Sequence, residues 1–212
     1  MPERRRGLVG PFSGRQIALA FGSVVAAAVI LVAVTTPLGT TGSPGPRDPR
    51  PTGVVVGPVE EGLRPGERAP ELVVTTDAGA EGPLLDLDGH PIRLADLRGK
   101  AVWLNFWASW CPPCQDETPT IRDLAKEYAD RGLVVVAVDV QETAEIARRY
   151  AERYELEHVI GPDVRADVFH RFKAYVLPTQ FFIDPDGVIR ARILGQVERA
   201  TAVSIIESIL PE

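Results

Sequence analysis

The chain has very little cysteine and histidine, with two cysteines and three histidines among its 212 residues. A small domain held together by disulfides would carry more cysteines. Cys111 and Cys114 are three positions apart, so a bond between them closes too short a loop to stabilise the fold much. A zinc site needs four ligands, and His90, His158 and His170 lack a ligand-like spacing. The sequence predicts a reactive cysteine pair, with no metal and no cofactor.

Basic residues are fewer than acidic ones, since 23 lysines and arginines against 29 aspartates and glutamates give a formal net charge of -6. The first 16 residues hold four arginines against one glutamate, a net of +3, so the remainder carries -6 - 3 = -9. An acidic body gives no electrostatic reason to expect nucleic-acid binding. With 45% hydrophobic and 25% charged residues, the composition is that of a globular protein with a core.

No charged residue occurs between Arg15 and Arg47. Residues 17–34 of this stretch are apolar, and as a helix they would span roughly 27 Å, close to the hydrocarbon thickness of a bilayer. The preceding arginines favour a cytoplasmic N-terminus at residues 1–16, a transmembrane anchor at 17–36 and an extracytoplasmic remainder. A cleaved signal peptide is the alternative, but the run exceeds a typical signal core and no good cleavage site follows it.

Residues 37–63 are rich in Gly, Pro, Thr and Ser and are expected to form a semi-extended linker. Residues 64–212 have the alternating pattern of an α/β domain with a mixed sheet, parallel at first and ending in an antiparallel hairpin. The pattern predicts strands at 72–75, 84–87, 101–107, 133–138, 179–183 and 188–194, and helices at 112–130, 143–154, 164–172 and 200–210.

The cysteine pair lies in the sequence WCPPC, after the predicted strand 101–107 and at the start of the predicted helix 112–130. A thiolate attacks a disulfide, and the positive end of a helix stabilises a thiolate on the first cysteine. The second cysteine, one turn later, can then release the mixed disulfide. Cys111 is therefore predicted to be the nucleophile and Cys114 the resolving thiol.

The segment 102–119, VWLNFWASWCPPCQDETP, resembles the active-site segment of the thioredoxin superfamily, and more narrowly the membrane-anchored TlpA/ResA-type thiol-disulfide reductases. Arg98-Gly99-Lys100 and the sequence VLPTQFFID at 176–184 fit the same pattern. The resemblance implies a thioredoxin-like mixed sheet flanked by helices, and a cis peptide bond before Pro178. The residues that it implies for substrate binding are Trp110, Pro112, Pro113, Leu177 and Pro178.

Two polar positions bear on proton handling. Asn105 stands where thioredoxin has a buried aspartate, and an amide cannot accept a thiol proton. Glu142 matches a glutamate that lies near the cysteines in ResA-type proteins and could move protons for the pair. A surface carboxylate at the start of the helix 143–154 is the alternative interpretation.

The resemblance and the WCPPC pair together predict a reductase of protein disulfides outside the cytoplasm, with apocytochrome c as the implied substrate and a membrane protein as electron donor. Pro112 and Pro113 supply neither an N–H donor nor a charge to a Cys111 thiolate, which disfavours a strong oxidant. An oxidase of the same fold, a peroxiredoxin-type peroxidase and a copper carrier are the alternatives. The peroxidase would need Thr in place of Ala108, and two thiolates suit Cu(I).

Overall fold

The computed structural model describes residues 54–56, 62–76 and 78–211. The predicted cytoplasmic segment 1–16 and membrane anchor 17–36 lie outside these residues, as does most of the predicted linker 37–63. Over the ranges that are described, no helix is both long and apolar enough to cross a membrane.

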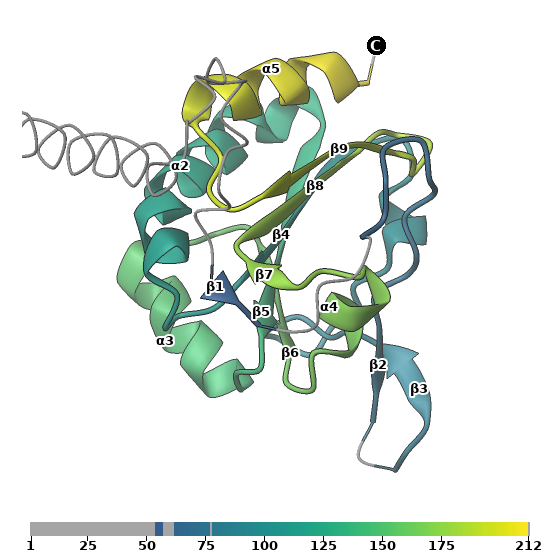
Figure 1. Ribbon diagram of the computed structural model, residues 1–212, viewed down its shortest axis with the longest axis vertical. Coiled ribbons are helices and arrows are strands. Elements are labelled where there is room, and N and C mark those ends of the chain that lie inside the picture. Colours follow the sequence, from purple (N-terminus) through teal and green to yellow (C-terminus); the bar gives the residue numbers. More distant parts are fainter. Residues whose placement is uncertain (1–53, 57–61, 77, 212) are drawn as a thin grey trace, which may run out of the picture. The chain divides into compact units, whose positions relative to one another are not determined.

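A five-stranded sheet with the order β6-β5-β4-β8-β9 forms the centre of the domain (Figure 1). β4, β5 and β6 run parallel to one another, whereas β8 is antiparallel to both β4 and β9. The expected mixed, thioredoxin-like sheet is therefore present. The strands are β4 (Ala101–Trp107), β5 (Leu133–Val140), β6 (Val159–Asp163), β8 (Thr179–Ile183) and β9 (Ile189–Leu194).

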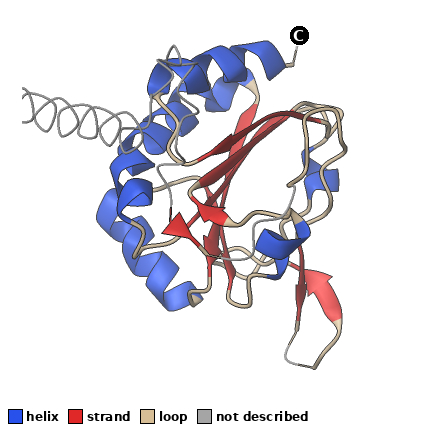
Figure 2. Ribbon diagram, in the orientation of Figure 1, coloured by secondary structure: helices blue, strands red, loops and turns tan. Residues whose placement is uncertain are grey.

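Every residue of β4 is buried, as a continuous apolar run predicts for a central strand. Helices cover both faces of the sheet (Figure 2), and alternate side chains of β4 point to opposite faces. Trp103 packs in one buried cluster with residues of α2 and α5, and Trp107 contacts Tyr150 of α3. Phe106 points the other way, onto Phe169 of α4. The helices are α2 (Pro112–Tyr128), α3 (Ala144–Tyr154), α4 (Asp167–Arg171) and α5 (Arg199–Ile209).

Two short strand pairs and two short 3-10 helices complete the described part of the chain. β1 (Val54–Val55) lies antiparallel to β7 (Val176–Leu177), and β2 (Val73–Thr75) lies antiparallel to β3 (Glu81–Pro83). β1 falls within the segment 37–63 that was predicted to be a linker. The 3-10 helices are η1 (Leu94–Leu97) and η2 (Ala129–Arg131).

Two predictions of secondary structure in the domain are wrong. The predicted strand 84–87 is displaced, because the hairpin partner of β2 is β3, and Leu85 forms only an isolated bridge with Pro91. β6 was not predicted, because glycine and proline are rare in strands and Gly161 and Pro162 lie within it. A proline is tolerated there since β6 is an edge strand. The predicted helix 164–172 is accordingly reduced to α4.

Candidate active site

The cysteine pair lies where β4 leads into α2. Cys111 is the N-cap residue of α2, and its Sγ accepts a hydrogen bond from the backbone N–H of Cys114 over 3.3 Å. The two cysteines form a disulfide, and their Cα atoms are 5.3 Å apart. Pro112 and Pro113 begin the helix, where a proline costs no hydrogen bond. The predicted order of strand, cysteine pair and helix is confirmed.

The residues around the pair divide into buried and exposed ones. Both cysteines are buried, whereas Trp110 is 45% exposed beside them. Trp107 is buried, and its ring centroid lies 4.5 Å from that of Tyr150. An apolar ring exposed next to a disulfide suits contact with another molecule.

A cis peptide bond joins Leu177 to Pro178, as expected. Thr179, the first residue of β8, is paired with Phe106 of β4. Because β8 runs antiparallel to β4, Pro178 and Leu177 continue past Phe106 toward the segment that carries Cys111. The structure thus brings the predicted residues 177 and 178 to the same end of the sheet as the disulfide.

Glu117 is a buried carboxylate one helical turn after Cys114 that the sequence interpretation missed. It accepts hydrogen bonds from Asn105 Nδ2 (3.0 Å), Gln180 Nε2 (2.7 Å) and the Val197 N–H (3.2 Å). Burial raises the pKa of Glu117 to about 7, although these three donors oppose the rise. The expectation that Asn105 leaves the site without a buried carboxylate is wrong, because Asn105 holds Glu117 there. The spacing of Glu117 from Cys114 was the available signal.

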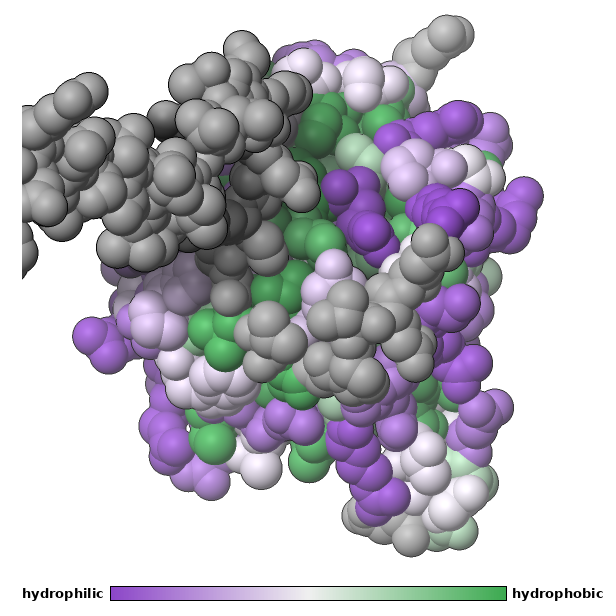
Figure 3. Space-filling view, viewed as in Figure 1, coloured by the Kyte–Doolittle hydropathy of each residue, from purple (hydrophilic) through white to green (hydrophobic). Residues whose placement is uncertain are grey.

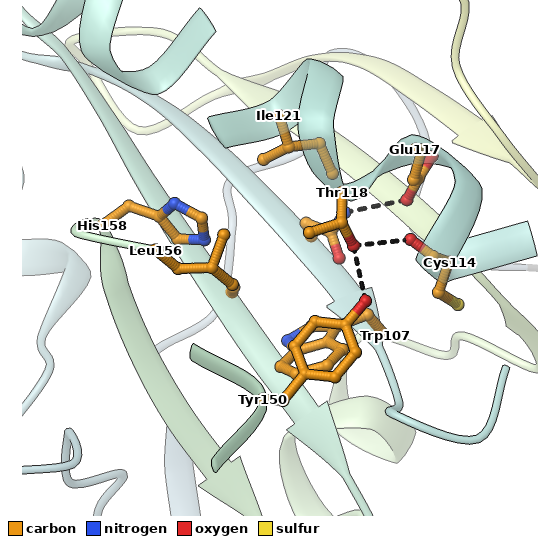
Figure 4. A pocket seen from close by; sticks show the side chains of 10 residues that line it. Trp107, Cys114, Glu117, Thr118, Ile121, Tyr150, Leu156 and His158 are labelled. Atoms are coloured by element: carbon orange, nitrogen blue, oxygen red, sulfur yellow. Dashed lines mark hydrogen bonds between the residues drawn. The ribbon is translucent and has the colours of Figure 1, made fainter. Parts of the chain in front are cut away.

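A small cavity lies between α2 and α3 and is lined by both Cys114 and Glu117 (Figure 4). Thr118 bridges its walls, since its hydroxyl donates to the Cys114 carbonyl and shares a 2.8 Å hydrogen bond with the Tyr150 hydroxyl. His158 also lines the cavity, and burial lowers its pKa to about 4. The imidazole is therefore neutral at pH 7, and Glu117 is the group in this cavity that titrates near neutrality.

Glu142 lies on the other side of the active-site segment. Its carboxylate accepts hydrogen bonds from the Ser109 N–H (2.5 Å) and the Ser109 hydroxyl (2.6 Å). Glu142 is only 6% exposed, and Thr143 is the N-cap residue of α3, so the alternative of a surface carboxylate is wrong. Glu142 fixes the segment that leads from β4 to Cys111.

Asp139, near the end of β5, is fully buried beside Glu142. Neither of its carboxylate oxygens has a donor among the described residues. Burial and the neighbouring Glu142 and Asp163 carboxylates raise the pKa of Asp139 to about 9. Asp139 is therefore protonated at pH 7, and its proton can serve as the donor to Glu142.

No group of three or more metal-ligating side chains occurs within the described ranges. The chemistry available at the site is exchange of the Cys111–Cys114 disulfide with external thiols. Nearby carboxyl groups can take up or release the accompanying protons.

Comparison with known proteins gives consistent matches. The model of the AhpC/TSA family matches residues 65–192. The chain is 32% identical over 152 residues to the thiol-disulfide oxidoreductase ResA of Bacillus cereus, which covers 72% of this chain and 82% of the relative. It is 36% identical over 146 residues to ResA of Geobacillus kaustophilus, and the match covers 69% of this chain and 78% of that relative.

A solved structure also matches the fold. It is a thiol:disulfide interchange protein of the thioredoxin family from Chlorobium tepidum, with a TM-score of 0.58 and 27% identity over 69% of this chain and 97% of the other. The fold, the cysteine pair and the sequence similarity thus all indicate thiol-disulfide exchange.

Proposed function

The chain belongs to the AhpC/TSA family and is a thiol-disulfide oxidoreductase of the ResA type, and we propose that it reduces the disulfides of other proteins outside the cytoplasm. The observation that carries the proposal is the Cys111–Cys114 disulfide at the N-terminus of α2, beside Glu117. The disulfide form is the product of such a reduction, since the enzyme's thiols are oxidised as the substrate's disulfide is reduced.

The composition of the first turn of α2 supports electron flow from the enzyme to the substrate. A CxxC protein is oxidising when its reduced form is stabilised, chiefly through the thiolate of the first cysteine. In this helix Pro112 and Pro113 have no N–H to offer. The donor to Cys111 Sγ that the structure shows is the Cys114 N–H, at 3.3 Å. With few hydrogen-bond donors, the Cys111 thiolate and hence the reduced form are stabilised little, which disfavours a strong oxidant.

The reaction runs in two exchanges. The Cys111 thiolate attacks a substrate disulfide, so that a Cys111–substrate bond forms, the substrate S–S bond breaks, and one substrate sulfur leaves as a thiolate that takes up a proton. Cys114 then loses its proton and attacks Cys111 Sγ. The Cys111–Cys114 bond forms as the Cys111–substrate bond breaks, and the second substrate sulfur leaves as a thiolate that takes up a proton, so two electrons have passed from the enzyme to the substrate.

The two buried glutamates have different positions in this scheme. Glu117 shares a cavity with Cys114, so its carboxylate can receive the Cys114 proton in the second exchange. Glu142 faces Ser109, three residues before Pro112, and is proposed to handle protons on the Cys111 side and to hold that segment in place.

The proposed substrate contacts are Trp110, Pro112, Pro113, Leu177 and Pro178. The proposed substrate class is a protein disulfide, with apocytochrome c as the member suggested by the resemblance. A membrane protein that donates two electrons would restore the Cys111–Cys114 dithiol. The arginine-flanked apolar run at 17–34 supports a membrane-anchored, extracytoplasmic location.

A peroxidase is less well supported, because Ala108 occupies the position where such an enzyme needs a threonine. A copper carrier has the two thiolates but no further ligand group within the described residues. An oxidase of the same fold differs from the proposed enzyme in its reduction potential, which can be measured.

The test is an equilibrium titration of the Cys111–Cys114 couple in dithiothreitol and glutathione buffers, monitored by alkylation. We expect a potential near thioredoxin's about -270 mV and well below the about -120 mV of a strong oxidant. This gap of about 150 mV corresponds to about 7 kcal/mol for two electrons, so the titration separates the two cases clearly. A protein that is fully reduced in a buffer poised at about -150 mV would be an oxidase.

A further inference from the structure

β7 runs beside the active-site segment and is paired along one edge with β1 (Figure 1). Val54 lies opposite Leu177, and Val55 opposite Val176. The Val56 N–H donates to the Tyr175 carbonyl over 2.8 Å. Val54, which lies 177 - 54 = 123 residues earlier in the chain, thus pairs with the backbone of Leu177, the residue that precedes Pro178.

The register shows which backbone groups are involved. Hydrogen-bonded and non-hydrogen-bonded residue pairs alternate in an antiparallel ladder. The bond from Val56 to Tyr175 makes Val55–Val176 a non-hydrogen-bonded pair, whose N–H and C=O groups point away from the partner strand. The Val176 carbonyl accordingly accepts from the Thr179 hydroxyl at 2.6 Å. Val54 and Leu177 then form a hydrogen-bonded pair, so β1 uses the hydrogen-bonding groups of Leu177.

Val54 and Val56 are partly buried against the hydrophobic cluster that contains Cys111, Cys114 and Leu177. Their spacing of two residues places both side chains on one face of the strand. Figure 3, seen from the same side as Figure 1, shows apolar surface near the middle of this face, with hydrophilic side chains to its right. An extended segment with apolar residues at alternate positions therefore fits this edge.

Leu177 is already among the proposed substrate contacts, and we propose that the chain's own Val54–Val56 covers the backbone edge of β7 until an extended, apolar segment of the substrate protein displaces it. This inference rests on the proposed function, because it concerns how a protein disulfide reaches Cys111. Peptides commonly bind by adding a strand to a sheet edge in this manner.

The covering strand suits a displaceable role. β1 has two residues, and a two-stranded sheet of this size is marginally stable in water. Val54–Val56 contains no cysteine, so it can occupy the edge without itself reacting with Cys111. The chain thus shields an apolar edge next to a reactive disulfide at low cost to the entering substrate.

The test compares Val56→Pro with Val55→Pro in the full chain. Val56→Pro removes the donor to the Tyr175 carbonyl, whereas Val55→Pro removes an N–H that points away from β7 and is the matched control. In Val56→Pro, hydrogen exchange at the Leu177 amide should be faster. The KM for a disulfide peptide with a Val-X-Val segment should fall about two- to tenfold, the weight of one backbone hydrogen bond.

Reduction of a small disulfide without a peptide segment, such as oxidised glutathione, should change little in Val56→Pro. A faster-exchanging Leu177 amide with an unchanged or higher KM for the peptide would overturn the proposal, because β1 would then belong to the fixed fold. If the Leu177 amide stays protected, the double variant Val54→Gly/Val56→Gly removes the apolar anchors, and the same fall in KM is required.

A synthetic peptide Gly-Val-Val-Val-Gly, which copies residues 53–57, provides a second measurement. It should inhibit reduction of the disulfide peptide competitively in the released variant, and absence of competition would overturn the proposal. The reduction potential separates this inference from the proposed function. An oxidising potential with intact competition refutes only the reductase assignment, and a reducing potential without competition refutes only the docking edge.

Discussion

Glu117 is held by three donors in a site from which water is largely excluded, and this balance places its pKa at about 7. Burial disfavours the charged form, while Gln180, Val197 and Asn105 favour it. The carboxylate can therefore accept a proton at neutral pH and release it again. Because Cys114 must lose its proton to attack Cys111, this is the property required of a general base in the second exchange.

We expect Glu117→Gln to slow the release of the mixed disulfide by roughly a hundredfold at pH 8, the low end for loss of a general base. The native rate should rise with pH through about 7 as Glu117 ionises, and the variant should lack this rise. Stopped-flow decay of a mixed disulfide between pH 5 and 9 measures both. Glu127→Gln, on an exposed side of the same helix, is the control, and an unchanged profile in Glu117→Gln would exclude the role.

Asp139 is a second buried carboxyl group, with no cation among the causes that shift its pKa. Its pKa of about 9 lies far above the ordinary 3.8, so between these values the folded protein holds a proton that the unfolded chain releases. Stability must then fall as pH rises through this window, by up to about 1.4 kcal/mol per pH unit. The carboxyl group costs stability at neutral and alkaline pH.

Replacement of Asp139 by Asn keeps a donor toward Glu142 and removes the ionisation. The free energy of unfolding of Asp139→Asn should therefore decline less than that of the native protein between pH 5 and 9, with the largest difference at the alkaline end. Urea denaturation at several pH values measures this, with exposed Asp130→Asn as the control. Parallel pH dependences for Asp139→Asn and the native protein would show that Asp139 does not hold the proton.

At the scale of elements, those with one strong local signal could be predicted from the sequence. β4 is apolar except for Asn105 and was predicted with its observed bounds, and α2 begins at the expected prolines. β6 was missed because an edge strand needs less apolar continuity than a central one, and VIGPD has the composition of a turn. β1 and β7 are two residues each, and only their pairing across the chain makes them strands.

The helical faces show the same limit. The helical spacing of Ile146, Tyr150 and Tyr154 predicts one apolar face for the helix 143–154, whereas the buried residues of α3 are Ala147, Tyr150 and Ala151. Tyr150 was placed correctly, but small alanines give little hydrophobic signal although they allow close packing against the sheet. In α5 the same spacing predicts a face of Val203, Ile206 and Leu210, whereas the buried residues are Ala202, Ile206 and Ile209. Packing partners decide the exact face.

The candidate site was predictable as far as its chemistry depends on residues close in sequence. The cysteine pair and its helix follow from the order of strand, WCPPC and helix, and the cis bond before Pro178 follows from the resemblance. Glu117 and Asp139 were not identified as titrating groups, because their pKa values depend on burial and on partners such as Gln180 and Glu142 from other elements. Such shifts arise only in the folded chain.

At the scale of the whole molecule, the charge distribution separates the chain into two parts. The first 16 residues have a net charge of +3, whereas the rest carries -9 and includes the redox domain. An acidic domain is compatible with a location outside a cytoplasmic membrane, since the positive-inside rule concerns the basic residues that flank an apolar run. A disulfide exchanger also has most use in an oxidising compartment, where protein disulfides persist.

This arrangement predicts that protease added to intact spheroplasts digests the redox domain and spares only a short membrane-protected fragment that includes the apolar run 17–34. The prediction follows from the positive-inside rule, by which Arg4, Arg5, Arg6 and Arg15 would keep the N-terminus on the cytoplasmic side. Replacing these four arginines by glutamate should reduce the digested fraction, because the charge difference that orients the run is reversed. A protected domain in the native protein would mean the opposite orientation. A shorter form released into the soluble fraction would identify the run as a cleaved signal peptide, leaving the exchange chemistry of Cys111 and Cys114 unaffected.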